Sequence, residues 1–491
     1  MVRIIRQGIL LALLWTAVGT AMPPHPDLAD RTAGGKQHLP YFAAHLEDMH
    51  AKGICTGHNP YQRKDKDVKA SGHRLPAFVG QFKALAILVE FSDHPGSVAA
   101  TFFDSLIFDS VGNTVADFYD EISYGQLDMV TANLPSSLDW RMAPQTYAYY
   151  VNGQNGTGAY PQNTQKLVED LVDQVDPLVD FSQYDNDGDG WVDVLVVVHS
   201  GTGAEYSGSN DDIWSHMWAI SPRLKDGVYI SDFTVQPELW ASAGDMTIGV
   251  YAHELGHGFG LPDLYDIDNT SNGIGKWGLM SYGSWNGYLG SSPAHPCAWS
   301  RIQMGFATEQ NILTNTYSRN IEAVENGGTI FRLWTSGAVG AEYFLIENRQ
   351  QVGYDNTLPG SGLLIWHIDD NKSGNTEEWW PGQTNANHYL VALEQADGLY
   401  ELEHKWDNGD AGDPFPGTNN KTSFDATTSP NSDSYAAGTS FVEVTNISSS
   451  GPTMTADLIV GFSAGLNDDP DPELPISMDL SQNYPNPFNP S

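Results

Sequence analysis

The 491-residue chain has only two cysteines, Cys55 and Cys297. A disulfide framework therefore does not hold the protein together, although one bridge between the two fits this count. Basic residues are also scarce, because 23 Lys and Arg stand against 61 Asp and Glu, a formal net charge of −38. This excess argues against a nucleic-acid partner, since such binding depends on basic contacts to phosphate. An acidic surface keeps a protein soluble and supplies carboxylates for hard cations.

Long apolar runs are absent beyond the N-terminus, where residues 9–15 read ILLALLW after a basic start. Small residues follow, with Gly19 and Ala21 three positions and one position before a plausible cleavage point. This order predicts a secretory signal peptide over residues 1–21, and its apolar run is too short to anchor a chain in a bilayer. We therefore expect an exported protein without a transmembrane segment.

The most informative stretch is an H-E-x-x-H motif formed by His253, Glu254 and His257. On a helix, residues four apart lie on the same face, so both imidazoles can reach one metal ion. Glu254, beside the first histidine, can then act as general base toward a metal-bound water. The pattern predicts a zinc hydrolase site.

The motif extends through Gly260, which can stop the helix and turn the chain, to Asp263 three residues later. Catalytic zinc usually takes three protein ligands and leaves a fourth position to water. Asp263 matches the third ligand, and another downstream carboxylate is the alternative if the chain turns differently. The extended form is far more specific than H-E-x-x-H alone.

A second candidate metal site is the acidic stretch DNDGDGWVD at residues 185–193. Its spacing is that of a calcium loop, with side chains at positions 1, 3, 5 and 9, glycine at 6 and a backbone carbonyl at 7. The twelfth position is Val196 rather than a bidentate Glu, so this is not an EF-hand. The alternative is an acidic turn with no ion. The expected calcium ligands are Asp185, Asp187, Asp189, Trp191 and Asp193.

Residues 75–310 alternate between strand and helix signals. Residues 84–91 and 192–199 read as buried strands, and residues 115–125 and 164–179 have the apolar spacing of helices. The helix with the histidines is expected to begin near Ile248. Helices packed against a twisted sheet, an α/β (α+β) catalytic domain with an active-site helix, fit this order.

After residue 310 short alternating segments appear, separated by turn residues, which is typical of an all-β sandwich. We expect such a sandwich-like domain over residues 311–462 and a Pro- and acid-rich linker over 463–476. The expected strands are Thr329–Trp334, Glu342–Glu347, Gly362–Ile368, His388–Glu394, Ser440–Asn446 and Thr453–Val460.

Residues 22–74 carry little periodic apolar patterning, and we interpret them as a propeptide, with a disordered linker as the alternative. Cys55 lies in this stretch. A propeptide thiolate can occupy the open position of a zinc ion and keep a protease latent. The alternatives are an incidental thiol and a disulfide with Cys297.

The ordered motifs HELGHGFGLPDLYD, GLMSYGSW, YDNDGDGWVDVLVVVHSGTGAE and IWSHMW resemble those of the secreted bacterial immune inhibitor A-like metallopeptidases. The resemblance continues through EYFLIENRQ (342–350), GLLIWHIDD (362–370) and ADG (396–398). It implies a zincin-like fold, a zinc-dependent endopeptidase made as a precursor, bound calcium, and protein or peptide substrates. It also implies that His253 and His257 are zinc ligands and that Glu254 is the base.

Met280 and Tyr282 follow the zinc motif in a glycine-rich loop. Metzincin-like peptidases place a methionine in a turn beneath the zinc ligands, and a core methionine is the alternative. The hydroxyl of Tyr282 can donate to the oxyanion of a tetrahedral intermediate, and a packing role is equally open. Of the other histidines, we expect His199 and His216 to be structural, and we expect Glu347 and Arg349 to form a buried structural pair.

Residues 477–491 resemble the start of a C-terminal sorting domain, which implies secretion or cell-surface attachment. Such domains continue through more strands, so we expect the sequence to be a fragment at this end. A disordered Pro/Asn tail is the alternative. For the whole chain, the rival functions are a surface-binding protein on a peptidase-like scaffold and a zinc hydrolase of non-peptide substrates.

Overall fold

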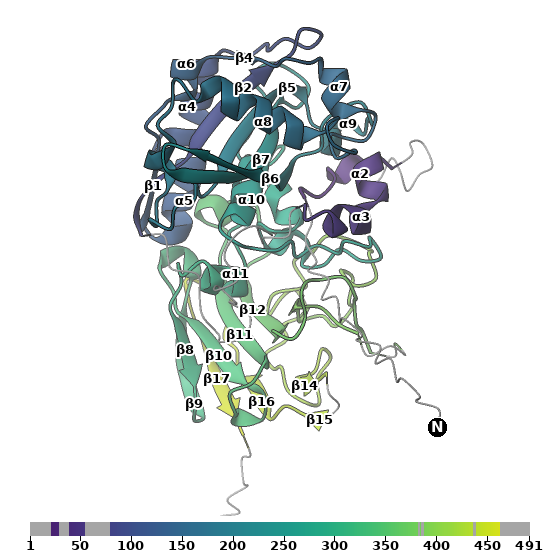
Figure 1. Ribbon diagram of the computed structural model, residues 1–491. Coiled ribbons are helices and arrows are strands. Elements are labelled where there is room, and N and C mark those ends of the chain that lie inside the picture. The colour runs from purple at the N-terminus through teal and green to yellow at the C-terminus, as the bar shows by residue number, and fades with distance from the viewer. Residues whose placement is uncertain are drawn as a thin grey trace, which may run out of the picture.

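The computed structural model describes residues 21–28, 39–54, 79–381, 383, 387–435 and 438–461. It has a mixed α/β architecture in which two lobes lie end to end (Figure 1). Most of the predicted signal peptide and propeptide, the linker and the predicted sorting domain lie outside the described residues. In the part of the chain that is described, no helix is long and apolar enough to cross a membrane.

The first lobe is built on a five-stranded sheet with the strand order β4-β2-β5-β7-β6. The strands β4, β2, β5 and β7 run parallel, and β6 pairs antiparallel with β7 at the edge. Their bounds are β2 Leu85–Glu90, β4 Arg141–Met142, β5 Leu195–Thr202, β6 His216–Lys225 and β7 Val228–Leu239.

Strict alternation along the central strands produces the two hydrophobic cores of this lobe. Leu85, Ile87 and Val89 point into one core, and Ala86 and Leu88 point into the other. The first core is covered by α8 (Thr164–Val175), and the second is covered by α4 (Ala100–Phe108), α5 (Val115–Ser123) and α10 (Gly249–Gly258). Both predicted helices of this lobe therefore form, and each begins at a side-chain cap, Thr114 for α5 and Asn163 for α8.

The remaining elements of this lobe are short. They are α2 Tyr41–Ala44, α3 Leu46–Ala51, β1 Gly80–Lys83, β3 Leu127–Val130, α6 Pro135–Leu138, α7 Tyr147–Val151, η1 Phe181–Tyr184, α9 Ala204–Ser207, η2 Gly275–Trp277, η3 Tyr282–Trp285 and α11 Ala298–Gln303.

The second lobe has two larger sheets, a five-stranded sheet β13-β12-β11-β10-β8 and a three-stranded sheet β16-β17-β9. Apolar side chains from both sheets form one shared core. The bounds are β8 Glu309–Ile312, β9 Thr316–Glu322, η4 Val324–Asn326, β10 Ile330–Trp334, η5 Thr335–Gly337, β11 Glu342–Arg349, η6 Gly353–Thr357, β12 Gly362–Asp369, β13 Val391–Leu393, β14 Asp433–Ser434, β15 Gly438–Thr439, β16 Val442–Thr445 and β17 Thr453–Val460. Each strand predicted for this lobe is present, although the one expected at 388–394 is shortened to β13.

Strand β12 explains how the two lobes hold together, because every one of its residues is buried. Leu363 and Ile365 face the core shared with the three-stranded sheet. Leu364, Trp366 and Ile368 face the opposite way, into the core of the first lobe. The five-stranded sheet is therefore covered on both sides, with α11 on the side toward the first lobe (Figure 1). The lobes share one continuous core.

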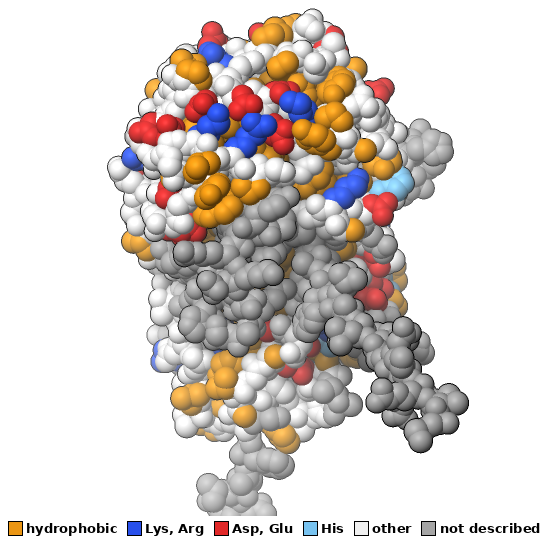
Figure 2. Space-filling view, in the orientation of Figure 1, with side chains coloured by type: hydrophobic (Ala, Val, Ile, Leu, Met, Phe, Trp, Pro, Cys, Tyr) orange, Lys and Arg blue, Asp and Glu red, His pale blue; other side chains and the backbone are white. Residues whose placement is uncertain are grey.

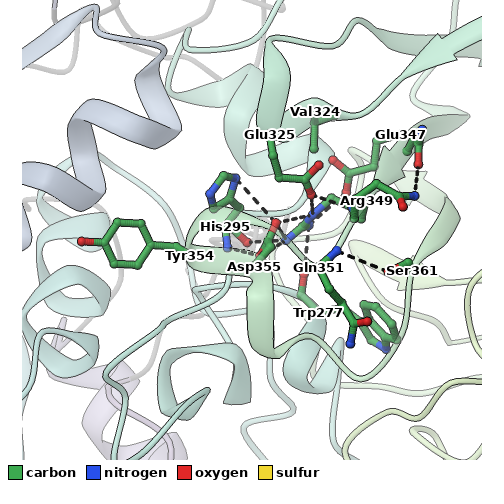
Figure 3. A network of polar contacts seen from close by, with 12 residues as sticks. Trp277, His295, Val324, Glu325, Glu347, Arg349, Gln351, Tyr354, Asp355 and Ser361 are labelled. Carbon is green, nitrogen blue, oxygen red and sulfur yellow. Dashed lines mark hydrogen bonds and ion pairs between the residues drawn. The ribbon is translucent and has the colours of Figure 1, made fainter. Parts of the chain in front are cut away.

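A buried ionic network crosses the same junction, centred on Arg349 of β11 (Figure 3). Its guanidinium donates to both carboxylate oxygens of Asp355 at 2.7 and 2.8 Å and to the backbone oxygen of Trp277 at 3.3 Å. The predicted pair is confirmed, since Arg349 Nη1 lies 3.3 Å from Glu347 Oε1. Burial alone raises the pKa of Asp355, but the Arg349 charge holds it well below its usual value.

The exposed face of the first lobe carries interleaved acidic and basic side chains over α8 and β6 (Figure 2). Arg223 Nη1 lies 2.6 Å from Asp173 Oδ2, and Lys225 Nζ lies 2.8 Å from Asp176 Oδ2. These are solvated pairs, each worth about 0–1 kcal/mol.

Candidate metal centre and active site

Helix α10 carries the H-E-x-x-H motif inside the first lobe and is buried along nearly its whole length. Two tyrosine hydroxyls fix its position. Tyr251 donates to Pro237 O of β7 at 2.9 Å, and Tyr119 of α5 donates to Ala252 O at 2.7 Å. The helix is thus fastened to the sheet on one side and to a neighbouring helix on the other.

The two histidines are held in one tautomer. His253 Nδ1 contacts Leu279 O at 2.9 Å, and His257 Nδ1 contacts Leu261 O at 2.8 Å. A carbonyl oxygen can only accept, so each Nδ1 carries the proton and each Nε2 presents a lone pair. Burial lowers the pKa of both rings to about 4, so both are neutral at pH 7, as metal ligands must be.

The carboxylate of Asp263 lies beside the Nε2 atoms of both histidines. Its Oδ1 lies 2.9 Å from His253 Nε2, and its Oδ2 lies 3.4 Å from His257 Nε2. Gly260 makes the return possible with a φ of +85°, a conformation that favours glycine. Two imidazole nitrogens and a carboxylate within 4.8 Å of one another form a donor set that fits zinc. Both Nε2 atoms are buried and have no hydrogen-bond partner in the described structure, which supports the fit.

Met280 lies directly against the active-site helix. A Cβ on Gly256, one residue before His257, would fall 2.5 Å from Met280 Sδ, so a larger residue there would displace the Met280 side chain. The Met280 carbonyl accepts from Leu264 N at 2.7 Å, which ties its loop to the residue after Asp263. The methionine therefore supports the segment that carries all three candidate ligands.

The candidate base Glu254 is fully buried and contacts the N-terminal segment of the chain. Its Oε1 accepts a hydrogen bond from Met22 N at 3.0 Å. On the other side of the same peptide bond, Tyr265 OH donates to the carbonyl oxygen of Ala21. The Ala21–Met22 bond, the predicted signal-peptide junction, thus lies between a carboxylate and a phenol.

Two indoles hold the next residues of this segment by their backbone. Trp214 Nε1 donates to Met22 O at 2.9 Å, and Trp285 Nε1 donates to Pro23 O at 2.9 Å. Sequence reasoning did not identify Tyr265, Trp214 or Trp285 as site residues. Their only signal was their place inside the motifs LPDLYD, IWSHMW and GLMSYGSW, because their contacts join residues about 190 to 260 positions apart.

Tyr282 is 4 % exposed and lies at the start of η3, with its ring centroid 6.2 Å from that of Tyr265. Burial, followed by the nearby Asp266 charge, raises the pKa of its phenol. The hydroxyl that touches the Ala21 carbonyl belongs to Tyr265 instead. Tyr282 thus packs edge-on against Tyr265, the tyrosine whose hydroxyl contacts the peptide segment.

In the predicted calcium loop, Asp185, Asp187 and Asp189 gather within 4.8 Å of one another. Gly190 has a φ of +89°, as a sharp turn requires. Asp193 instead turns toward Asn186, accepting from its backbone N at 2.9 Å and its Nδ2 at 2.8 Å. Trp191 donates its backbone N–H to Asp189 Oδ1 at 3.0 Å. Three of the five predicted ligands are thus brought together by their side chains.

Two further histidines and one cysteine are buried away from the zinc motif. His216 is hydrogen-bonded at both ring nitrogens, to Thr164 Oγ1 and to Trp214 O, which agrees with a structural role. His199 lies in the central strand β5 with Nδ1 against Ser200 O. Cys297 is a free, buried thiol, and burial raises its pKa to about 11. Cys55 lies outside the described residues.

Comparison with known proteins covers the lobe that contains this site. Residues 78–310 match the family model described as the catalytic domain of immune inhibitor A peptidase M6. Immune inhibitor A of Bacillus thuringiensis subsp. alesti is 34% identical over 191 residues, which is 31% of this chain and 27% of that protein. Pre-pro-metalloprotease PrtV of Vibrio cholerae serotype O1 is 28% identical over 273 residues, 45% of this chain and 29% of that protein. The chain thus spans less than a third of the length of these relatives.

Proposed function

We propose that this chain, whose residues 78–310 belong to the catalytic domain family of the immune inhibitor A M6 peptidases, is a zinc-dependent endopeptidase acting on proteins. The observation that carries the proposal is the convergence of His253, His257 and Asp263 beside the buried carboxylate of Glu254. The family implies a metal, and the two imidazoles with one carboxylate favour zinc over a hard cation.

Zinc bound by these three side chains would polarise the substrate carbonyl and lower the pKa of the attacking water. The chain's own residues supply the rest of the chemistry. Glu254 takes the proton from the water and passes it to the leaving amine. Its contact with the backbone N–H of Met22 supports this role, because Glu254 must lie within hydrogen-bond distance of the amide nitrogen to which it passes the proton.

Two tyrosines are candidates to stabilise the oxyanion, Tyr282 and Tyr265. A donor to the oxyanion must lie within hydrogen-bond distance of the carbonyl oxygen under attack. In the chain that still carries Ala21, Tyr265 donates to the carbonyl of Ala21, and Met22 N of the same peptide bond donates to Glu254. A substrate peptide bound in the same place would present its carbonyl to Tyr265. We therefore assign the oxyanion role to Tyr265 and a supporting role to Tyr282.

We further propose that the protein is exported as a precursor, with residues 22–74 as its propeptide. Met22 and Pro23 engage Glu254, Trp214 and Trp285 through backbone groups, and a substrate peptide would use the same contacts. One relative is described as a pre-pro-metalloprotease, which agrees with this proposal. Calcium at residues 185–193 and attachment through a sorting domain remain predictions.

The deciding experiment compares the parent with Glu254→Gln. The variant should retain one zinc per chain by metal analysis and lose about 10²–10⁴-fold in the rate of casein cleavage, the range typical of a lost general base. A chelator should abolish the parent's activity, and added zinc should restore it.

Casein cleavage by Glu254→Gln at the parent rate would refute the assignment. A chelator-resistant binding activity without cleavage would favour the surface-binding alternative. Zinc-dependent hydrolysis of a non-peptide ester with no peptide cleavage would favour the non-peptide hydrolase.

A further inference from the structure

Outside the zinc centre, four carboxylates converge in the loop that follows β13. Asp397 and Glu401 come from one segment, and Asp410 and Asp413 come from a second segment that begins nine residues after Glu401. One oxygen from each lies within 4.8 Å of one from every other member. We refer to these four residues as the loop cluster.

Gly412 shows how closely the two segments approach. A Cβ at this position would fall 2.5 Å from Asp397 Oδ2 and 2.9 Å from Asp410 Oδ1. Both carboxylates thus lie close to one backbone position, and a larger residue there would displace them. Backbone N–H groups orient two members further, since Leu399 N donates to Asp397 Oδ1 at 3.0 Å and Asp410 N donates to Asp413 Oδ2 at 3.0 Å.

Asp413 supplies an independent sign of a ligand, because it is only 1 % exposed. Its Oδ2 accepts from Trp277 Nε1 at 2.8 Å, but its Oδ1 is buried with no hydrogen-bond partner among the described residues. Glu401 Oε2 is likewise buried and has no hydrogen-bond partner among the described residues. A buried carboxylate oxygen left without a donor costs several kcal/mol unless a cation meets it.

Among the described residues, Lys421 is a cation whose charge acts on Asp397 of the loop cluster, but it forms no ion pair with it. Within the described parts of the chain, no Lys, Arg or His forms an ion pair with any of the four carboxylates. A cation among the four carboxylates would offset their mutual repulsion.

We propose that Asp397, Glu401, Asp410 and Asp413 bind one calcium ion. The donor set is all oxygen, which favours a hard cation over zinc, and a site made of four protein carboxylates suits Ca²⁺ better than Mg²⁺, which usually keeps several waters. This site lies in the second lobe and is separate from both the zinc centre and residues 185–193.

The ion would fasten the second lobe to the active-site loop. Leu402 O accepts from Asn272 N at 3.0 Å, and Asn408 O accepts from Lys276 N at 2.8 Å. Together with the Trp277–Asp413 hydrogen bond, these contacts anchor the residues that lead directly to Met280. Calcium at the loop cluster therefore stabilises the segment beneath the zinc ligands without taking part in the reaction.

The test uses the full chain carrying Glu254→Gln, so that self-cleavage does not interfere. Metals are removed with a chelator, zinc is restored, and Ca²⁺ is titrated while bound calcium and the thermal unfolding midpoint are measured. We expect one calcium per chain to bind at the loop cluster and to raise the midpoint by several degrees. Mg²⁺ at equal concentration should produce a much smaller rise.

Asp410→Asn is the informative variant, because Asp410 is exposed and its replacement should not disturb folding. The variant should bind one calcium ion fewer than the parent. The rise in its thermal unfolding midpoint should need at least a tenfold higher calcium concentration. Asp187→Asn, in the other acidic loop, is the matched control and should keep that ion. Equal calcium binding in Asp410→Asn and the parent, or none in the parent, overturns the proposal, whatever the outcome for peptidase activity.

Discussion

Met22 donates its backbone N–H to Oε1 of Glu254 at 3.0 Å, although the two residues are 232 positions apart. The carboxylate assigned as the general base is therefore engaged by the chain's own N-terminal segment. One oxygen of the Glu254 carboxylate is occupied by this hydrogen bond while the segment is in place. The segment must leave before a substrate peptide can take its place.

Trp285→Phe should loosen this segment, because the change removes the indole donor to Pro23 O and keeps an aromatic ring. A neutral hydrogen bond contributes about 0.5–1.5 kcal/mol, so the population with the segment released should rise about 2–10-fold. The measurement is the initial rate of peptide cleavage by the intact precursor, taken before any processing.

Trp240→Phe is the matched control. The two indole rings lie 5.0 Å apart, but Trp240 Nε1 is directed to Thr247 rather than to the segment. Its initial rate should stay at the parent value. Equal rates in Trp285→Phe and Trp240→Phe would mean that the segment is not held by the Trp285 contact.

Replacing each tyrosine by phenylalanine separates the roles of Tyr265 and Tyr282. Tyr265→Phe should lower kcat by about 10²-fold with little change in KM, the cost of one lost oxyanion donor. Tyr282→Phe should have a much smaller effect, because Tyr265 is the tyrosine whose hydroxyl donates to the segment. Bound zinc, measured in both variants, should match the parent, and a larger loss of kcat in Tyr282→Phe would reverse the assignment.

The parts of the fold that could be predicted are those encoded over short distances. Alternating apolar residues located β2, β10, β11, β12 and β17, and helical spacing located α5 and α8. The spacing of His253, Glu254, His257 and Asp263 likewise needs only a helix and one glycine turn to bring the candidate ligands together. In each case the physical constraint lies within about a dozen residues.

What the sequence did not reveal depends on contacts between distant segments. The antiparallel hairpin β6–β7 was missed, because its buried positions include Ser231, Thr234 and Gln236 and so weaken the apolar alternation. The loop cluster was missed because its carboxylates are spread over seventeen positions, and only the fold brings them around Gly412. Tertiary packing decides such sites, and a local pattern cannot report it.

The buried network around Arg349 predicts a large stability effect from a conservative change. Asp355→Asn removes the negative charge that accepts two hydrogen bonds from the Arg349 guanidinium. The buried positive charge of Arg349 is then less well balanced. Breaking a buried pair on one side costs about 3–5 kcal/mol. Calorimetry should therefore show a fall in the unfolding midpoint of several degrees. Asp173→Asn, which weakens an exposed pair with Arg223, should shift the midpoint by far less, and similar shifts would contradict the role of burial.

Glu205 predicts a pH dependence of stability. It is fully buried, and burial raises its pKa to about 7 from a usual 4.5. The hydrogen bond that Ser215 donates to it at 2.6 Å opposes this rise, and the charge of Asp212 adds to it. Between these two values the folded state holds a proton that the unfolded state has lost. The contribution is therefore fully present below pH 4.5 and is lost as pH rises through 7.

Glu205→Gln should remove this dependence, because the amide stays neutral at every pH. A shift of this size corresponds to about 3 kcal/mol, so the variant should gain stability relative to the parent at pH 8 and little or none at pH 4.5. The measurement is the free energy of unfolding by denaturant across this range. Glu443→Gln, the same change at an exposed position of β16, should leave the slope unchanged. A Glu205→Gln profile parallel to that of the parent would show that Glu205 is ionised in the folded protein throughout, with its charge compensated inside the core.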